Sequence, residues 1–533
     1  SVTPYTTEAV IEAFGKSCVD ALRKNAAAHG VARDDQIPLS FTEFKNSLTK
    51  LDSLGRAYNS QYAGRTGYVH GDSVQLERFV TELATADMTP DAKGYAAYLA
   101  QVAPALWPVI TKDVPATLPA VERRRHTYIV GATGSGKSEL LKVIIAEHVR
   151  LDDSAVLVLD PHVDLARDVA QLPVVANSGR LIYASANVAP GHAVTVNPLE
   201  PPKGATVGEQ ERIAYHLAEA LNSLSGGTAT SRMVRFLRAT IRVLLDRPGS
   251  TLLDLYALTS DNPPADILAL GRKHPAAMVR SFFEEDINSA DMHRARFGIR
   301  ARLAEMLDAS GFQAFTCGPS TIDLEQAIAD RSILVFALGS LGKAVGTDVG
   351  LLLIALMTAL GERRQVNEAL PRSPVHIVVD ECQLMVGEST VTILDEMRKF
   401  GVYLTLSQQR AGQGMPQAMK EAVLTGPAVK LCGQTDDAGD LMRLMAIEDR
   451  DTPQKLSADA SKGLFQFACR WGRSAKPFIL NVRGDLVGQK LPKDQWQDLL
   501  AGQIGTYYRP IRENRSSGGE APADTAGSRW ELK

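Results

Sequence analysis

A glycine-rich turn between an apolar run and a helical run places phosphate-binding groups in one stretch, TYIVGATGSGKSELLKV at 127–143. The turn has the G-x-x-x-x-G-K-S spacing, in which backbone N–H groups and a helix N-terminus surround a β-phosphate. Lys137 would reach the β- and γ-phosphates, and the Ser138 hydroxyl would bind Mg²⁺. The stretch therefore predicts a P-loop for ATP and Mg²⁺. The residues expected to contact the nucleotide are Gly131, Ala132, Thr133, Gly134, Ser135, Gly136, Lys137, Ser138 and Glu139.

Two adjacent carboxylates follow a second apolar run, PVHIVVDECQLMV at 374–386. At the end of a strand beside the P-loop, Asp380 could hold Mg²⁺ through water, and Glu381 could polarise the water that attacks the γ-phosphate. A strand that ends in a solvated acidic turn is the alternative. Because a P-loop is present, the pair favours hydrolysis over binding alone.

The run VYLTLSQQR at 402–410 adds a polar strand end, where a glutamine could touch the γ-phosphate and report its hydrolysis. Arg398 and Lys399 lie just before this run. An arginine there would lie at the rim of its domain, where a neighbouring subunit could receive it as an arginine finger. A solvated basic pair that favours a helix dipole is the alternative.

Short apolar runs separated by helical stretches must position these groups, and this alternation predicts a parallel sheet covered on both faces. We expect RSILVFAL at 331–338 to lie between the P-loop strand and the acidic strand, which makes the core a RecA-like α/β fold. The predicted strands are 126–130, 155–160, 180–185, 331–338, 376–381, 402–407, 428–433, 464–471 and 476–482, and a helix is expected at 438–446.

Changes of periodicity divide the chain into five parts. The last part is low in apolar residues towards its end, which predicts disorder from about 510, unless Trp530 and Leu532 anchor it. The predicted parts are an N-terminal helical domain at 1–120, the first half of the ATPase core at 121–204, an inserted all-α module at 205–320, the second half of the core at 321–490 and an extension at 491–533.

Composition indicates the compartment and excludes some classes. The five scattered cysteines contain no C-x-x-C, which suits a reduced cytoplasmic protein and excludes a zinc finger. The N-terminus lacks a signal peptide, and GLLLIALMTALG at 350–361 is too short to span a bilayer, so we expect a buried helix and no transmembrane segment in this chain. The net charge of −3 argues only weakly against a DNA-binding channel.

In this order, the motifs resemble the soluble ATPase part of the FtsK/HerA superfamily. Within it they are most similar to the type IV secretion coupling-protein (TraG/TraD-like) family, which feeds conjugative DNA to a secretion channel. Val163 stands where relatives often have glycine, and this departure affects the geometry of one loop. The likeness covers about 122–485 and rests on GATGSGKSELL, AVLVLDPHVDLARDV, VTVNPLEPP, TLLDLYALT, ARLAEML, IDLEQAIADRSILVFALGS, HIVVDECQ, EMRKFGVYLTLSQQ and Asp437-Ala438.

The resemblance implies a role for each matching residue. The nucleotide and Mg²⁺ would be bound by Lys137 and Ser138. The metal and catalysis would be served by Asp380 and Glu381. Arg398 would be the arginine finger in trans, and Gln409 would be the γ-phosphate sensor. It further implies a hexameric ring that threads DNA, with relaxase or secretion-channel partners, acting at the inner face of the bacterial membrane through them. Coupling proteins commonly begin with membrane helices, which are not seen here, and residues 1–120 match no part of the family.

DNA contact has one candidate helix, SRMVRFLRATIRVLL at 231–245. Its basic stripe could follow a phosphate backbone, although a solvated helix face is the commoner meaning of such a stripe. The stripe consists of Arg232, Arg235, Arg238 and Arg242, and a second cluster consists of Arg294, Arg296, Arg300 and Arg302. The catalytic motifs thus predict an ATPase, and the family resemblance implies a DNA-stimulated motor for conjugative transfer or mobilisation. The alternatives are a HerA-like translocase that partners a nuclease and an adaptor whose nucleotide controls assembly without translocation.

Overall fold

The computed structural model describes residues 120–511, except 224–229, 437–438, 448–451, 460, 462, 472–476, 484–485 and 487. The predicted N-terminal helical domain, the predicted disordered tail with its anchor, and the Asp437-Ala438 pair lie outside the described residues.

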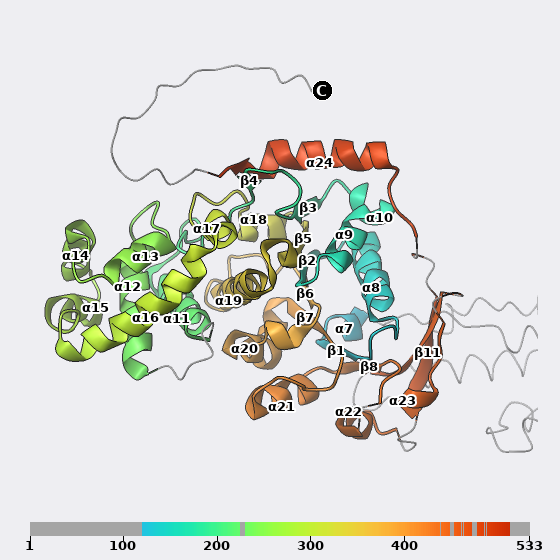
Figure 1. Cartoon of the computed structure of the whole chain (residues 1–533). Helices are drawn as coiled ribbons and strands as arrows, with labels where there is room; N and C mark the ends of the chain where they lie inside the picture. Colours follow the sequence, from blue (N-terminus) through green and yellow to red (C-terminus); the bar gives the residue numbers. More distant parts are fainter. Residues whose placement is uncertain are drawn as a thin grey trace, which may run out of the picture.

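A ten-stranded sheet forms the centre of the described chain, in the order β11-β10-β8-β1-β7-β6-β2-β5-β3, with β9 beside β10 (Figure 1). The strands from β8 to β3 in this order pair in parallel, and β10 pairs with its neighbours in antiparallel fashion. All nine predicted strands occur, and the mostly parallel α/β fold is confirmed. The strands are β1 Thr127–Val130, β2 Ala155–Asp160, β3 Leu181–Ala184, β5 Ile333–Ala337, β6 Val375–Val379, β7 Val402–Gln408, β8 Val429–Cys432, β9 Ala458–Asp459, β10 Leu464–Trp471 and β11 Phe478–Arg483.

Helices cover both faces of this sheet, because its central strands are apolar on both sides. One face packs against α8, α9 and α10, and the other against α19, α20 and the helices that precede β5 (Figure 1). The helices around the sheet are α7 Ala120–Arg123, α8 Lys137–Leu151, α9 Asp164–Gln171, α10 Pro173–Ala176, η3 Leu338–Leu341, α19 Lys343–Val366, η4 Cys382–Leu384, α20 Glu388–Glu396, η5 Met397–Phe400, α21 Gln417–Thr425, α22 Gly439–Leu444, α23 Thr452–Lys455 and α24 Lys493–Tyr507.

The position of one strand differs from the prediction. The strand from RSILVFAL, β5, lies between β2 and β3, and β7 is the strand between β1 and the acidic strand β6. The reason is the short connection before β5. Helix α18 (Leu324–Ala329) packs against β2, and only three residues separate it from β5, so β5 must start beside β2.

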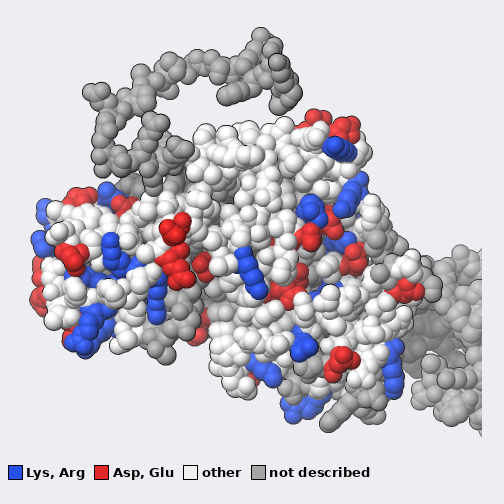
Figure 2. Space-filling view, viewed as in Figure 1, with Lys and Arg blue, Asp and Glu red and all other residues white. Residues whose placement is uncertain are grey.

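Between β4 (His192–Ala193) and β5 the described chain is helical, and α11 to α16 lie to one side of the sheet, whereas α18 packs on β2 (Figure 1). Helix α11 joins the region to the core by packing along α19. Both signs of charge are interspersed over this region (Figure 2). Its helices are α11 Val207–Ser223, α12 Ser231–Leu245, α13 Leu252–Leu258, α14 Ala265–Arg272, α15 Ala277–Ser281, η2 Phe282–Asp286, α16 Ala290–Asp308, α17 Ser310–Thr316 and α18.

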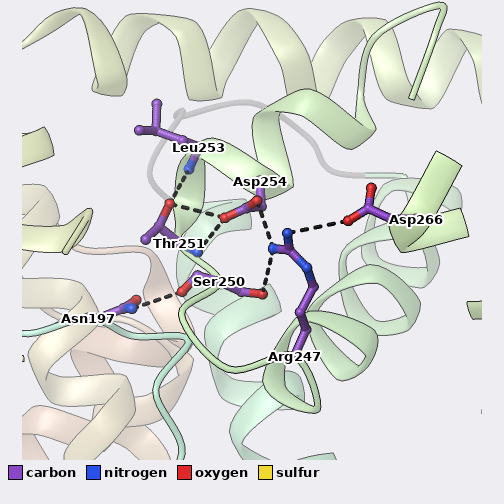
Figure 3. A network of polar contacts seen from close by, with 7 residues as sticks. All are labelled: Asn197, Arg247, Ser250, Thr251, Leu253, Asp254 and Asp266. Atoms are coloured by element: carbon purple, nitrogen blue, oxygen red, sulfur yellow. Dashed lines mark hydrogen bonds and ion pairs between the residues drawn. The ribbon is translucent and has the colours of Figure 1, made fainter. Parts of the chain in front are cut away.

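A polar network fixes the turn between α12 and α13 to the segment that follows β4 (Figure 3). The Asn197 amide, which is buried, donates to the Ser250 carbonyl over 2.8 Å. The Thr251 hydroxyl caps α13, and Arg247 bonds to Asp254 over 3.1 Å. Since a buried amide without its partner costs about 1–3 kcal/mol, this network holds the helical region in a defined orientation.

Helix α19 contains the apolar run that was predicted to be a buried helix. It is the one described helix that is long and apolar enough to cross a membrane, but 67% of its most apolar window is buried inside the protein. The prediction of a core helix is therefore confirmed.

Helix α24 lies across the free edge of β3 (Figure 1). The Gln503 side chain accepts from the Tyr183 N–H over 2.9 Å and donates to the Leu181 carbonyl over 2.9 Å. The Tyr508 hydroxyl accepts from the Ser185 N–H over 3.0 Å, and β12 (Arg509–Pro510) pairs with β4. These bonds satisfy backbone groups that would otherwise offer a pairing edge to another chain.

Three buried histidines gather at the amino ends of the central strands. The ring of His376, on β6, lies between His148 of α8, at 3.7 Å, and Tyr403 of β7, at 5.1 Å. His126, just before β1, accepts the Leu404 N–H of β7 over 3.0 Å. Burial lowers the pKa of His126 and His148 to about 4, helped by Arg398 and Arg123 respectively, and lowers the pKa of His376 well below its usual range.

These histidines predict acid-sensitive stability. Their pKa values are lower in the folded than in the unfolded chain, so only the unfolded chain takes up protons as the pH falls below about 6.5. Stability should be complete above that pH and should fall towards pH 4 by up to about 1.4 kcal/mol per pH unit for each histidine. Urea unfolding at pH 7.5 and 5.5 measures the loss, which should be smaller in His376→Phe than in wild type or in the control His293→Ala, whose ring is exposed. Equal losses in all three proteins would contradict this account.

Candidate nucleotide site

The predicted P-loop connects β1 to α8 at the carboxyl edge of the sheet. Gly134 and Gly136 have φ values of 83° and 89°, a region that side chains with a Cβ disfavour. A Cβ on Gly136 would also lie 2.3 Å from the Phe465 ring. The Ala132 N–H donates to the Gln434 carbonyl over 2.8 Å. The loop is therefore held between its own glycine turns and the segment that follows β8.

Lys137 begins α8 and is buried, with 8% of its surface exposed. Its ammonium group donates to the Gly131 carbonyl over 2.7 Å and, more weakly, to the Ala132 carbonyl over 3.4 Å. Burial lowers the pKa of Lys137, while the nearby carboxylates of Glu381 and Asp380 oppose that shift. The lysine and the acidic pair, far apart in sequence, thus share one electrostatic environment.

Asp380 follows β6 and is also buried. The Ser407 hydroxyl of β7 donates to it over 2.6 Å. Burial raises the pKa of Asp380, and the charges of Glu381 and Asp160 raise it further. Among the described residues no group of three or more His, Cys, Asp and Glu could hold a metal. Asp380 and the exposed Ser138 hydroxyl supply oxygen ligands alone, which fits Mg²⁺, because this ion binds few protein ligands and completes its shell with water and substrate phosphate.

Glu381, Gln409 and Thr133 form a chain of contacts from β6 to the P-loop. The Gln409 amide donates to Glu381 over 2.9 Å and accepts from the Thr133 hydroxyl over 3.4 Å. The Gln383 amide donates to the other Glu381 oxygen over 2.7 Å. The structure thus brings together the predicted base, the predicted sensor and the loop, because β7 lies between β1 and β6.

Gln408, adjacent to Gln409, faces the opposite way. Its side-chain oxygen accepts from the Tyr128 hydroxyl over 2.7 Å and from the Gly412 N–H over 3.1 Å. Its side-chain NH₂ group donates to the Gln413 carbonyl over 2.7 Å. The Gly412 N–H also bonds to the Tyr128 hydroxyl over 3.2 Å. Of the two glutamines, one contacts the predicted catalytic glutamate and the other anchors the loop that follows.

Asp160, at the end of β2, is a further carboxylate near the site that the sequence motifs did not indicate. This fully buried carboxylate accepts the His162 N–H over 2.8 Å and the Ala166 N–H over 2.9 Å. Burial raises its pKa. The sequence feature that could have indicated Asp160 is its position in DPHVDLA, at the end of an apolar run, where a carboxylate can cap a turn. In that turn Val163 has a φ of 80°, so the valine places a β-branched side chain where glycine fits better.

Arg398 lies at the opposite edge of the sheet. It belongs to η5, which precedes the amino end of β7, whereas the P-loop follows the carboxyl end of the adjacent β1. Its exposed side chain has no hydrogen bond or ion pair with any described residue. A seven-residue strand separates it from Gln409, so it cannot serve the P-loop of its own chain.

The arginines of α12 are all paired with acids. Each of the four carries a salt bridge to a carboxylate, so the stripe presents little net charge to solvent. In the second cluster, Arg296 is buried and Arg300 stacks on Tyr256, whereas Arg294 is 82% exposed. The α12 pairs are Arg232 with Asp291, Arg235 with Asp286, Arg238 with Glu219 and Arg242 with Glu211.

Residues 108–171 match the family model described as the central domain of helicase HerA. The match includes the P-loop and agrees with the FtsK/HerA resemblance of the motifs. No curated protein matches the sequence.

Several solved structures are similar to the chain at low identity. The conjugative coupling protein TrwBdeltaN70, in an unbound form, is 14% identical, covering 70% of this chain and 81% of its own, with a TM-score of 0.42. VirB4 of Thermoanaerobacter pseudethanolicus is 14% identical, with coverages of 72% and 95% and a TM-score of 0.43. Plasmid coupling protein TrwB in complex with ADP and Mg²⁺ is 14% identical, with coverages of 71% and 89% and a TM-score of 0.48.

The two adjacent glutamines should respond differently to mutation. Gln409→Ala removes the contact to Glu381 and should lower kcat for ATP hydrolysis about 10- to 100-fold without changing the melting temperature. Gln408→Ala leaves the buried Tyr128 hydroxyl without its acceptor and should cost about 1–3 kcal/mol of stability. Steady-state kinetics and thermal unfolding of both variants test the assignment. A normal kcat in Gln409→Ala, or an unchanged melting temperature in Gln408→Ala, would reverse it.

Proposed function

We propose that the chain is a Mg²⁺-dependent ATP hydrolase that works as a ring-forming DNA motor of the coupling-protein kind. The observation that carries the ATPase part is the contact chain from Thr133 through Gln409 to Glu381, beside the buried Lys137 and Asp380. These contacts link the predicted P-loop to Glu381, the carboxylate that we propose activates the water.

The chemistry assigned to these residues is attack of water on the γ-phosphate. Lys137 and the loop amides hold the phosphates, and Glu381 takes the proton of the water as its oxygen bonds to phosphorus. The bond from phosphorus to the bridging oxygen breaks, and its electron pair stays on ADP. Ser138 and Asp380 would hold Mg²⁺, which would supply charge neutralisation for the phosphates when bound. Gln409 holds Glu381 and senses whether the γ-phosphate is present.

The two edges of the sheet support the proposed ring. Because Arg398 is exposed, unpaired among the described residues and remote from its own P-loop, its proposed place is the nucleotide site of a neighbouring copy. Repetition of this contact closes a ring, which we propose is a hexamer. DNA passes through the ring, and relaxase or secretion-channel components are the proposed partners in conjugative transfer.

Arg398→Ala should reduce ATP hydrolysis roughly 10³-fold or more while ATP binding persists, because the finger acts only on the transition state. The neighbouring exposed Lys399→Ala is the matched control and should retain activity. Mixing Arg398→Ala with Lys137→Ala in equal amounts should restore about a quarter of the wild-type activity. In randomly assembled rings, about a quarter of the interfaces join an intact Lys137 of one subunit to an intact Arg398 of its neighbour. The rate of the mixture, compared with each variant alone, makes the test. No recovery in mixed rings would refute action in trans.

The DNA part predicts a rate that depends on DNA and salt. ATP hydrolysis by the full chain should rise with single- or double-stranded DNA, and the stimulation should fade with added salt, because phosphate contacts release counterions. Rates measured across a salt series, with each DNA form and without DNA, provide the test. Hydrolysis that neither form stimulates, in a protein that assembles normally, would favour the adaptor and remove DNA from the proposal.

The family match favours a second candidate, a HerA-like translocase that partners a nuclease in repair or defence. Affinity purification from the native host distinguishes the two. A nuclease that stays bound at high salt supports this candidate, whereas a relaxase or secretion component supports the first.

A further inference from the structure

A cleft of about 390 Å³ opens beside Glu381 at the carboxyl edge of the sheet. Three strand ends and the start of α19 form its walls, and no P-loop residue lines it. In the strand order β1, β7, β6 and β2, the cleft extends over the ends of β7, β6 and β2, on the side of the P-loop where Glu381 lies. The lining residues that matter here are His162, Lys343, Glu381, Gln383, Gln409 and Arg410.

The cleft has two unpaired cations and one carboxylate that is already engaged. Lys343 and Arg410 are exposed, and neither side chain has an ion pair or hydrogen bond with a described residue. Both Glu381 oxygens accept glutamine amides, from Gln409 and Gln383. This contrasts with α12, where every arginine is paired. The free positive charge of the cleft therefore remains available to an anion.

The loop that carries Arg410 is fixed from within the core. Gln408 bonds to the backbone of Gly412 and Gln413, and the buried Tyr128 hydroxyl bonds to Gly412. Both Tyr128 and Gln408 are almost fully buried. Arg410 thus starts from a preorganised backbone at the rim of the cleft, which lowers the entropy cost of binding an anion.

The direction of the proposed reaction brings an anion to this cleft. In an in-line displacement, the γ-phosphorus moves away from ADP and towards the attacking water, which is the side of Glu381. Gln383 adds an unused acceptor, because its side-chain oxygen is buried and has no partner among the described residues. Orthophosphate carries a P–O–H group that could donate to this oxygen.

We propose that the cleft is a binding site for the inorganic phosphate product, held by Lys343 and Arg410, with the Gln383 oxygen accepting its hydroxyl. The proposal rests on the ATP hydrolysis proposed above. The site holds phosphate after bond cleavage while ADP remains on the P-loop, so phosphate release becomes a separate step through the cleft.

Equilibrium dialysis of radiolabelled orthophosphate against the full chain, in the presence of saturating Mg²⁺ and ADP, tests this site without turnover. Lys343→Ala and Arg410→Ala should each weaken phosphate binding about tenfold, because each removes one charge-assisted contact. Lys343→Arg should keep most of the affinity, and Lys493→Ala, an exposed lysine on α24, should not change it. ADP binding should be equal in all five proteins, since none of these substitutions touches the P-loop.

Product inhibition gives a second readout in the same proteins. The inhibition constant for phosphate should rise about tenfold in Lys343→Ala and Arg410→Ala, while that for ADP stays constant. Phosphate binding that is absent in wild type with ADP bound, or unchanged in both alanine variants, would overturn the site. If a short oligonucleotide displaces the bound phosphate, and this displacement requires Lys343, the cleft binds the DNA backbone and the proposed phosphate site is also refuted. ADP binding that survives Lys137→Ala would instead refute the proposed nucleotide site.

Discussion

The pairing of β7 between β1 and β6 is the constraint on which the nucleotide site depends. In a parallel sheet the carboxyl ends of neighbouring strands meet at one edge, so the residues after these three strands become neighbours. Successive side chains then face different partners: Ser407 bonds to Asp380, Gln408 to Tyr128 and Gln409 to Glu381. With any other strand in this position, the P-loop and the acidic pair would lack the residues that connect them.

The same pairing determines what happens at the opposite edge. Tyr403 near the start of β7 stacks on His376 at the start of β6, and His376 stacks on His148 of α8. Since α8 begins with Lys137, the helix that carries the P-loop lysine packs at its far end against β6, at the same edge of the sheet as Arg398. Neutral histidines suit this place, because burial and the arginines both disfavour added charge. The two edges of one sheet thus hold the two halves of the nucleotide site proposed for a ring.

The helical region shows how a charge pattern acquires meaning only with its neighbours. The α12 stripe would be a strong positive surface if it faced water alone, but acids from α11, η2 and α16 neutralise it. In the cleft that Glu381 lines, by contrast, Lys343 and Arg410 form no ion pair with a described residue, and both oxygens of Glu381 are bonded to glutamine amides. Whether basic residues can bind an anion therefore depends on whether acids already pair with them, and the number of basic residues in a segment is a poor guide to it.

The sequence by itself determined the P-loop, the acidic strand end, the nine main strands and the buried apolar helix. These features depend on residues that are close in the chain, where glycine conformation, the positions of apolar residues and strand length act locally. It did not determine that β7, and not β5, lies next to β1. Nor did it determine which glutamine contacts Glu381, that Asp160 caps its turn, that the α12 arginines are paired or that α24 covers β3. Each of these is a contact between segments far apart in sequence. Their partners are selected by the short turn before β5, by the register of parallel strands and by the cost of leaving buried polar groups unpaired, and only the tertiary structure decides them.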